Sequence, residues 1–131
     1  MIVLDASAVV ELLMDTDIGR VVAERISDSS LPIHVPHLID LEVAQALRRY
    51  VRAGLMDPGR AAVALDDLRA FGVSRHAHVP FVDRVWELRG NLTAYDACYV
   101  ALAEALDAVL ITCDRALARA PGVAARIECL A

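Results

Sequence analysis

The sequence contains no lysine: all thirteen basic residues among its 131 are arginines. Any mechanism that needs a catalytic lysine is therefore excluded. Long apolar runs are also missing. Because no window of about 18 residues is free of charge, we expect no segment that spans a bilayer. The first residues include Asp5 and Glu11 but no basic region, which argues against a secretory signal. We therefore expect a soluble, cytoplasmic protein.

Cysteine and aromatic residues are scarce. The three cysteines show no CxxC spacing, so neither a disulfide framework nor a zinc clip is indicated. Aromatic residues make up 5% of a chain that is 57% hydrophobic, so alanine, valine and leucine must form most of the core. That hydrophobic content excludes intrinsic disorder. The net charge of −5 argues against a protein that coats nucleic acid without sequence preference, because such binding needs cationic charge.

Apolar runs alternate with segments of helical periodicity along the whole chain. Strands are expected at Ile2–Asp5, Val73–Val79, Ala108–Thr112 and Arg126–Cys129. Asp28–Pro36 is expected to be a loop, and helices are expected at about Ser7–Met14, Gly19–Ser27, Leu38–Ala53, Asp57–Gly72, Pro80–Arg89, Thr93–Leu106 and Asp114–Ala120. Ser7 is expected to cap the first of these helices. The length fits one domain, residues 1–131, and the alternation indicates a three-layer α/β/α fold with a mostly parallel sheet.

Four acidic residues are expected at one edge of that sheet. Asp5 ends the first strand, and Asp114 lies two residues beyond the Ala108–Thr112 strand. In an open parallel sheet, ligands bind beyond the carboxyl ends of the strands. Glu42 lies early in its helix, and Asp96 lies in the first turn of the helix that leads into Ala108–Thr112. A helix antiparallel to the strand that it feeds begins at the same edge, so all four carboxylates can meet there.

Most of these carboxylates also fit an ordinary structural role. Thr93 and Asp96 match a capping box, and Asp114 matches a helix N-cap. Glu42 fits a solvated helix position, although no cationic residue lies three or four positions later. Asp5 fits such a role least well, because a carboxylate that closes an apolar strand is costly to desolvate without a partner.

Four carboxylates at one edge repel one another, and a divalent cation relieves that repulsion. Hard oxygen ligands of this kind suit Mg²⁺ or Mn²⁺. Such ions can activate a water and stabilise the leaving oxygen in phosphodiester hydrolysis, with no histidine base or serine nucleophile. Ser7 and Thr112 lie next to the acidic edge, where their hydroxyls can support the metal ligands.

Four segments follow one another across nearly the whole chain: MIVLDASA, HLIDLEV, NLTAYDACYVALAE and LITCDRAL. Together they resemble the PIN-domain ribonucleases, and within them the VapC-type toxins of bacterial toxin–antitoxin pairs. The resemblance implies a PIN-like fold and assigns a catalytic, metal-binding role to Asp5, Glu42, Asp96 and Asp114. It also implies an RNA substrate, a homodimer, and a small VapB-type antitoxin that occludes the site within a hetero-oligomer.

The leading interpretation is therefore a Mg²⁺-dependent endoribonuclease toxin. Arg48, Arg49 and Arg52 fall on one side of the Glu42 helix, away from Tyr50, and either contact RNA phosphates or form an ordinary solvated face. The alternatives are a PIN-fold binding module without activity, and another metal-dependent phosphatase or nuclease. The lack of lysine disfavours a receiver domain. The lack of a D-x-D motif near the N-terminus disfavours a dehalogenase-like phosphatase.

Overall fold

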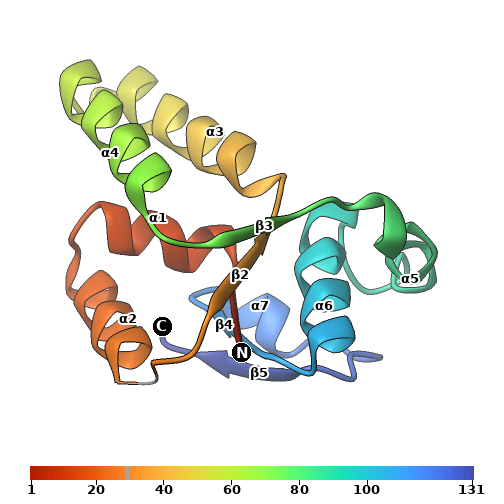
Figure 1. The fold of residues 1–131 in the computed structure, drawn as a ribbon. Coiled ribbons are helices and arrows are strands. Elements are labelled where there is room, and N and C mark those ends of the chain that lie inside the picture. Colours follow the sequence, from red (N-terminus) through yellow and green to blue (C-terminus); the bar gives the residue numbers. More distant parts are fainter. Residues whose placement is uncertain (29) are drawn as a thin grey trace.

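A parallel sheet with the strand order β3-β2-β1-β4-β5 forms the centre of the molecule (Figure 1). The structure is a computed structural model that describes residues 1–28 and 30–131. The strands are β1 (Ile2–Leu4), β2 (Ile33–Pro36), β3 (Ser74–His76), β4 (Val109–Thr112) and β5 (Arg126–Cys129). Every pair of neighbouring strands in this sheet is parallel, which confirms the expected α/β fold.

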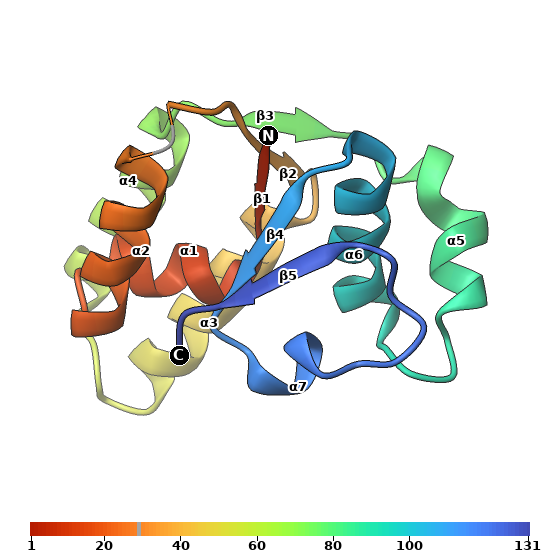
Figure 2. The same cartoon turned by 90° about the horizontal axis from the view of Figure 1, so that it is seen from below.

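Helices cover both faces of this sheet. They are α1 (Ala6–Leu13), α2 (Asp17–Ser27), α3 (Ile39–Arg52), α4 (Pro58–Ala70), α5 (Val82–Glu87), α6 (Ala94–Leu106) and α7 (Arg115–Ala118). Figure 2 shows α1 and α2 on one side of the strands and α5 and α6 on the other. Helices α3 and α4 pack against each other and against α1. In the part of the chain that the structure describes, none of the helices combines the length and apolar character that crossing a membrane requires.

Small aliphatic side chains build the core, as the composition predicts. All three residues of β1 are fully buried, and so are Leu110 and Ile111 of β4. Helix α6 is buried over the seven consecutive residues Ala97–Ala103 and packs against β1, β2 and β4. Its alanines let the helix backbone approach the sheet closely. The largest side chain in this buried run, Tyr99, carries a hydroxyl into the interior.

The segment Asp28–Pro36 contains a strand where the sequence predicted only a loop. Ile33–Pro36 forms β2, which lies between β1 and β3 in the sheet. Ile33 pairs with Ile2, and Val35 pairs with Arg75. These partners are distant in sequence, and a local pattern with two prolines gives no sign of them. The expectation of a loop over the whole segment was wrong for this reason.

Some element ends also differ from the expectation. Strand β3 covers only three of the seven residues expected in Val73–Val79, and α2 begins at Asp17 rather than Gly19. The helix expected from Pro80 begins as a 3₁₀ turn, Val79–Phe81, and becomes α-helical only from Val82.

The strand order places a topological switch point at β1. From β1 the sheet extends to β2 on one side and to β4 on the other. Ligands of open α/β sheets bind outside the carboxyl ends of the strands at such a point. Asp5 follows β1, and the turn with Cys113 and Asp114 follows β4. These residues therefore lie where a ligand of this fold is expected to bind.

Candidate active site

Asp5 is held in place by the start of the helix that follows it. It is only 4% exposed and forms the N-cap of α1. Its Oδ1 accepts hydrogen bonds from Ser7 Oγ at 2.7 Å and from the Ala8 N–H at 3.1 Å. Its Oδ2 accepts a hydrogen bond from Thr112 Oγ1 at 2.6 Å. Asp5 therefore caps α1 in place of Ser7, the cap expected from the sequence, because the Ser7 hydroxyl donates its proton to Asp5.

Two hydroxyls connect Asp5 to the turn after β4. Ser7 Oγ accepts a hydrogen bond from the Cys113 N–H at 3.0 Å, and Thr112 Oγ1 accepts one from the Asp114 N–H at 2.9 Å. The two hydroxyl oxygens lie 3.3 Å apart. Each hydroxyl has a single proton to donate, and both hydroxyls donate it in a hydrogen bond to Asp5. Ser7 and Thr112 thus lie beside the acidic edge, as the sequence predicts.

Asp114 and Asp96 both lie at the starts of helices. Asp114 is the N-cap of α7, and its Oδ1 accepts hydrogen bonds from two backbone N–H groups of that helix. The Asp96 N–H donates to Thr93 Oγ1 at 3.1 Å, so Thr93 caps α6. The capping roles predicted for Thr93 and Asp114 are confirmed. They do not exclude a second role, because both aspartates also face the pocket.

Glu42 is half-buried in α3 and is not a solvated helix residue. Its Oε1 is buried, and within the described chain this atom has no hydrogen-bond partner; the same is true of the Tyr99 hydroxyl. Burial raises the pKa of Glu42, and the nearby Tyr99 side chain lowers it to a smaller extent. A buried carboxylate oxygen without a regular donor is costly. It is also an oxygen left available to a cation.

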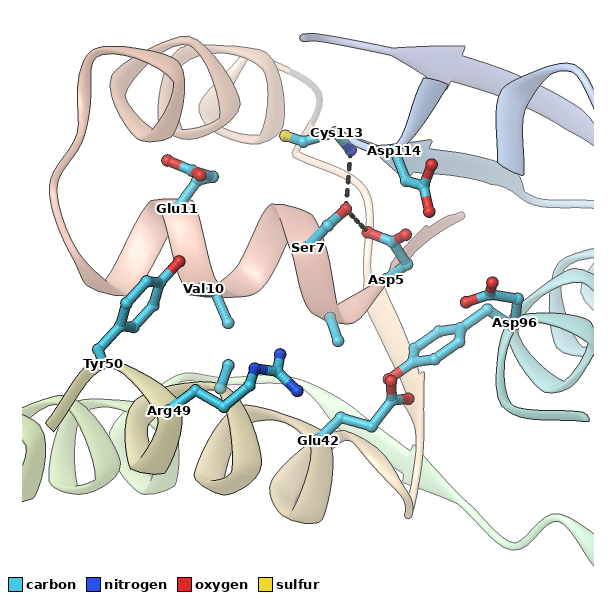
Figure 3. A pocket seen from close by; sticks show the side chains of 13 residues that line it. Asp5, Ser7, Val10, Glu11, Glu42, Arg49, Tyr50, Asp96, Cys113 and Asp114 are labelled. Atoms are coloured by element: carbon cyan, nitrogen blue, oxygen red, sulfur yellow. Dashed lines mark hydrogen bonds between the residues drawn. The ribbon is translucent and has the colours of Figure 1, made fainter. Parts of the chain in front are cut away.

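One pocket of about 330 Å³ brings the four carboxylates together. Asp5, Glu42, Asp96 and Asp114 all line it, and Figure 3 shows them reaching it from four different elements of the chain. The sequence prediction that they meet at one edge of the sheet is therefore confirmed. Their assignment as catalytic and metal-binding residues stays a prediction.

The carboxylates share one electrostatic environment. Desolvation is the main reason why the pKa values of Asp5, Glu42 and Asp96 are all raised. Repulsion adds to this effect: Asp96 raises the pKa of Asp5, and both raise that of Glu42. Asp114 in turn raises the pKa of Asp96. Across residues 1–28 and 30–131, no three His, Cys, Asp or Glu side chains form a ready-made metal cluster.

The pocket also contains residues that the sequence analysis did not assign to it. Beside the aliphatic Ala6, Val10 and Ala46, they are Glu11, Arg49, Tyr50, Tyr99 and Cys113. Helical spacing is the signal that could have found two of them. Glu11 lies one turn after Ser7 on α1, and Tyr99 lies one turn after Asp96 on α6.

The three arginines of α3 have different surroundings. Arg49 lines the acidic pocket. Arg48 lines only a second pocket, which is formed mainly by other residues of α3, and Arg52 lines neither. Figure 3 shows the Arg49 side chain extending between Glu42 and Tyr50. Tyr50 is 37% exposed and lines the same pocket as Arg49. Tyr50 therefore lies beside Arg49 at this pocket, whereas Arg48 and Arg52 do not line it.

Comparison with curated proteins gives relatives across most of the chain. Ribonuclease VapC9 of Mycobacterium tuberculosis is 43% identical over 116 residues, which are 87% of this chain and 86% of that protein. Ribonuclease VapC12 of the same species is 41% identical over 131 residues, which are the full length of both chains.

Solved structures share the fold. The chain is similar to PAE2754 from Pyrobaculum aerophilum with a TM-score of 0.71 and 29% identity, covering 96% of this chain and 81% of that one. It is similar in fold to a DNA-bound VapBC from Salmonella typhimurium with a TM-score of 0.70 and 15% identity, covering 99% of this chain and 98% of that one. The PIN domain family matches residues 2–123. The chain therefore belongs to the PIN-domain family and, within it, to the VapC ribonucleases.

Proposed function

We propose that this protein is a metal-dependent endoribonuclease and the toxin of a VapBC-type toxin–antitoxin pair. Its membership of the VapC ribonucleases supports RNA as the substrate. The observation that carries the proposal is the convergence of Asp5, Glu42, Asp96 and Asp114 on one pocket at the switch point of the sheet. Among the described residues that line this pocket there is no histidine that could serve as a base. Carboxylates are therefore its main reactive groups.

The donor set fits a hard divalent cation such as Mg²⁺ or Mn²⁺. Every candidate ligand is a carboxylate oxygen, and Glu42 Oε1 is buried without a hydrogen bond. Mg²⁺ commonly keeps several waters and binds through one or two carboxylates, so it does not need a ready-made cluster of three ligands. When bound, the cation supplies an activated water and positive charge for the phosphate. Asp5, Glu42 and Asp96 are the residues that would hold it, with Asp114 beside them.

The remaining groups of the pocket orient these carboxylates. Ser7 and Thr112 hold the Asp5 carboxylate in place by donating one hydrogen bond to each of its two oxygens. The buried Tyr99 side chain lowers the pKa of Glu42 and so favours its charged form. Arg49 brings the one positive charge among the described residues that line the pocket, and its guanidinium suits a phosphate oxygen of the RNA. A phosphate of the substrate would thus lie between the Arg49 guanidinium and the carboxylates.

The antitoxin is expected on the apolar surface next to the site. A pocket of about 240 Å³ contains Leu55, Met56 and Met14, and it shares Val10, Glu11 and Tyr50 with the acidic pocket. Leu55 is 76% exposed. A VapB-type segment that covers this surface would reach the carboxylates directly and block RNA. Family membership supports such a partner, and we also propose the homodimer that the resemblance implies.

The proposal is tested by incubating the purified protein with single-stranded RNA in Mg²⁺, in Mn²⁺ and in EDTA. We expect cleavage with either metal, none in EDTA, and recovery when Mg²⁺ is added back. Asp96→Asn removes one carboxylate of the pocket and should abolish cleavage. Asp67→Asn removes an exposed carboxylate of α4 and should not. Cleavage that resists EDTA, or equal activity of the two variants, would overturn the proposal.

A further inference from the structure

A second pocket of about 690 Å³ opens beside the acidic one. Both pockets are lined by Glu42 and Arg49, so they adjoin at these two residues. The other side chains around the second pocket include Leu41, Gln45 and Arg48 of α3, and Tyr95 in the first turn of α6. An RNA strand that leaves the acidic pocket on this side would therefore enter the second pocket directly.

Tyr95 is an exposed aromatic residue in the first turn of α6. Its side chain lies next to Asp96 in sequence and is 65% exposed, whereas the buried run of α6 begins only at Ala97. Leu41, on the α3 side of the same pocket, is 76% exposed. An aromatic ring and an aliphatic side chain thus stand open to solvent within a few residues of the carboxylates.

The polar groups of the second pocket complement a nucleotide. Arg48 is exposed, and its guanidinium can bind one phosphate through two N–H groups at once. The Gln45 amide carries both a donor and an acceptor, as the edges of nucleobases do. Proteins that bind single-stranded nucleic acid combine cationic side chains along the backbone with aromatic rings on which bases stack.

We propose that the second pocket binds one nucleotide of the RNA next to the cleaved bond, with its base stacked on Tyr95 and its phosphate beside Arg48. This inference rests on the proposed ribonuclease activity and adds a subsite to it. Arg49, which lines both pockets, then lies where the backbone passes from the subsite to the carboxylates. Tyr95 and Arg48 are substrate-positioning residues, and the chemistry stays with the acidic pocket.

The charges of the pocket favour RNA over a second copy of this chain. In a two-fold symmetric contact centred on this pocket, Arg48 and Arg49 of one copy would lie close to those of the other. A phosphate backbone instead supplies the negative charge that both arginines lack. Among the described residues neither arginine has a salt bridge of its own.

The test uses a short single-stranded RNA that the protein cleaves, and versions of it with one abasic nucleotide at successive positions. Tyr95→Ala should lower kcat/KM about fivefold to tenfold, mainly through KM, whereas Tyr95→Phe keeps the ring and should stay near wild type. An abasic nucleotide beside the cleaved bond should weaken the wild type to a similar extent. In Tyr95→Ala that same change should have little further effect, because base and ring act as one pair.

Arg48 is tested through the salt dependence of RNA binding. Binding is measured by fluorescence anisotropy in the Asp5→Asn background, where the proposed function predicts no cleavage. Arg48→Ala should reduce the slope of log affinity against log salt by about 0.7, the share of one phosphate contact on a single strand. Arg20→Ala removes the same charge from α2, lines neither pocket, and should leave the slope unchanged.

Three results would overturn the subsite. One is a Tyr95→Ala variant as active as the wild type. Another is a loss that is equal for intact and all abasic RNAs. The third is a loss that accompanies dissociation of a dimer in sedimentation, which would assign the surface to self-association. A wild type that cleaves no RNA in Mg²⁺ would contradict the proposed function instead. The binding measurements would still report on Arg48, and repeating them with Tyr95→Ala would report on the ring.

Discussion

The Thr112 hydroxyl donates a 2.6 Å hydrogen bond to Asp5 Oδ2, although 107 positions separate the two residues in the chain. The bond joins the end of β4 to the end of β1. Thr112 Oγ1 also accepts the N–H of Asp114. One buried hydroxyl therefore sets the orientation of the Asp5 carboxylate and the position of the turn that carries Asp114.

Replacing Thr112 tests this relationship. Thr112→Val keeps the shape of the side chain but removes the donor to Asp5 and the acceptor for the Asp114 N–H. Leaving buried polar groups unpaired costs about 1–3 kcal/mol each, so the variant should unfold at a lower denaturant concentration and cleave RNA more slowly. Thr112→Ser keeps the hydroxyl and is the matched control, with stability and activity much closer to the wild type. Equal effects of the two substitutions would show that the hydroxyl is not responsible.

Asp5→Asn should separate activity from stability. The amide can keep the hydrogen bonds from Ser7 and Ala8, and it can donate to Thr112 in place of accepting. It removes a charge that is buried and repelled by Asp96. We therefore expect loss of cleavage together with a higher melting temperature in metal-free buffer at neutral pH. An unchanged cleavage rate, or a clearly lower melting temperature, would contradict the role given to Asp5.

The same carboxyl predicts how the stability of the metal-free protein depends on pH. The pKa of Asp5 is raised in the folded state, so the unfolded chain releases this proton first as the pH rises. The stability contribution of Asp5 is therefore complete below its unfolded pKa and is lost as the pH rises through the folded pKa. Denaturant unfolding of the wild type and Asp5→Asn should accordingly give a difference that is largest at neutral pH and shrinks on acidification. A difference independent of pH would contradict the raised pKa.

Much of the fold could be predicted from local patterns, and the exceptions depend on distant partners. The apolar runs at β1 and β4 and the long helices α3 and α6 are visible in the sequence because burial imposes their periodicity. Strand β2 is not, since its central place is given by β1 and β3 rather than by its own composition. The capping of α1 was misassigned between Asp5 and Ser7 for a related reason. The choice depends on which group receives the Ser7 proton, and that is a three-dimensional property.

The site was predictable where topology alone places a residue. Asp5 and Asp114 follow adjacent strands, so their meeting at one edge follows from a parallel sheet. The effect of Tyr99 on the pKa of Glu42 could not be predicted in the same way, because the two side chains come from different helices and meet only in the folded chain. The positions of Arg48, Arg49 and Arg52 show the same limit. One helix face in the sequence becomes three different environments once neighbouring elements are in place.

A thermal-shift measurement can test whether Glu42 is a metal ligand. A cation that binds only the folded protein stabilises it by about 1.4 kcal/mol at tenfold excess over its dissociation constant. Mg²⁺ or Mn²⁺ should therefore raise the melting temperature of the wild type and raise that of Glu42→Gln much less. Glu24→Gln makes the same change on the exposed surface of α2 and should respond like the wild type. Equal shifts in all three proteins would exclude Glu42 as a ligand.

Gly19 provides a test of the packing that positions Glu11 at the pocket. It lies in the first turn of α2, where its N–H donates to Thr16 Oγ1 at 2.9 Å. A Cβ at this position would lie 2.0 Å from the backbone oxygen of Glu11. Helix propensity favours alanine over glycine by about 1 kcal/mol, but overpacking costs about 1–3 kcal/mol, and here the obstacle is backbone that cannot rotate away.

The clash should therefore outweigh the propensity, and Gly19→Ala should lower the melting temperature by several degrees. Gly72→Ala is the control, because its Cβ would meet nothing within 4 Å. Cleavage by Gly19→Ala should also fall at temperatures where the variant remains folded, since α1 cannot yield to α2 without moving the Glu11 end of the pocket. A Gly19→Ala protein more stable than the wild type would show that the two helices can separate without cost, and that their close contact does not hold Glu11 in place.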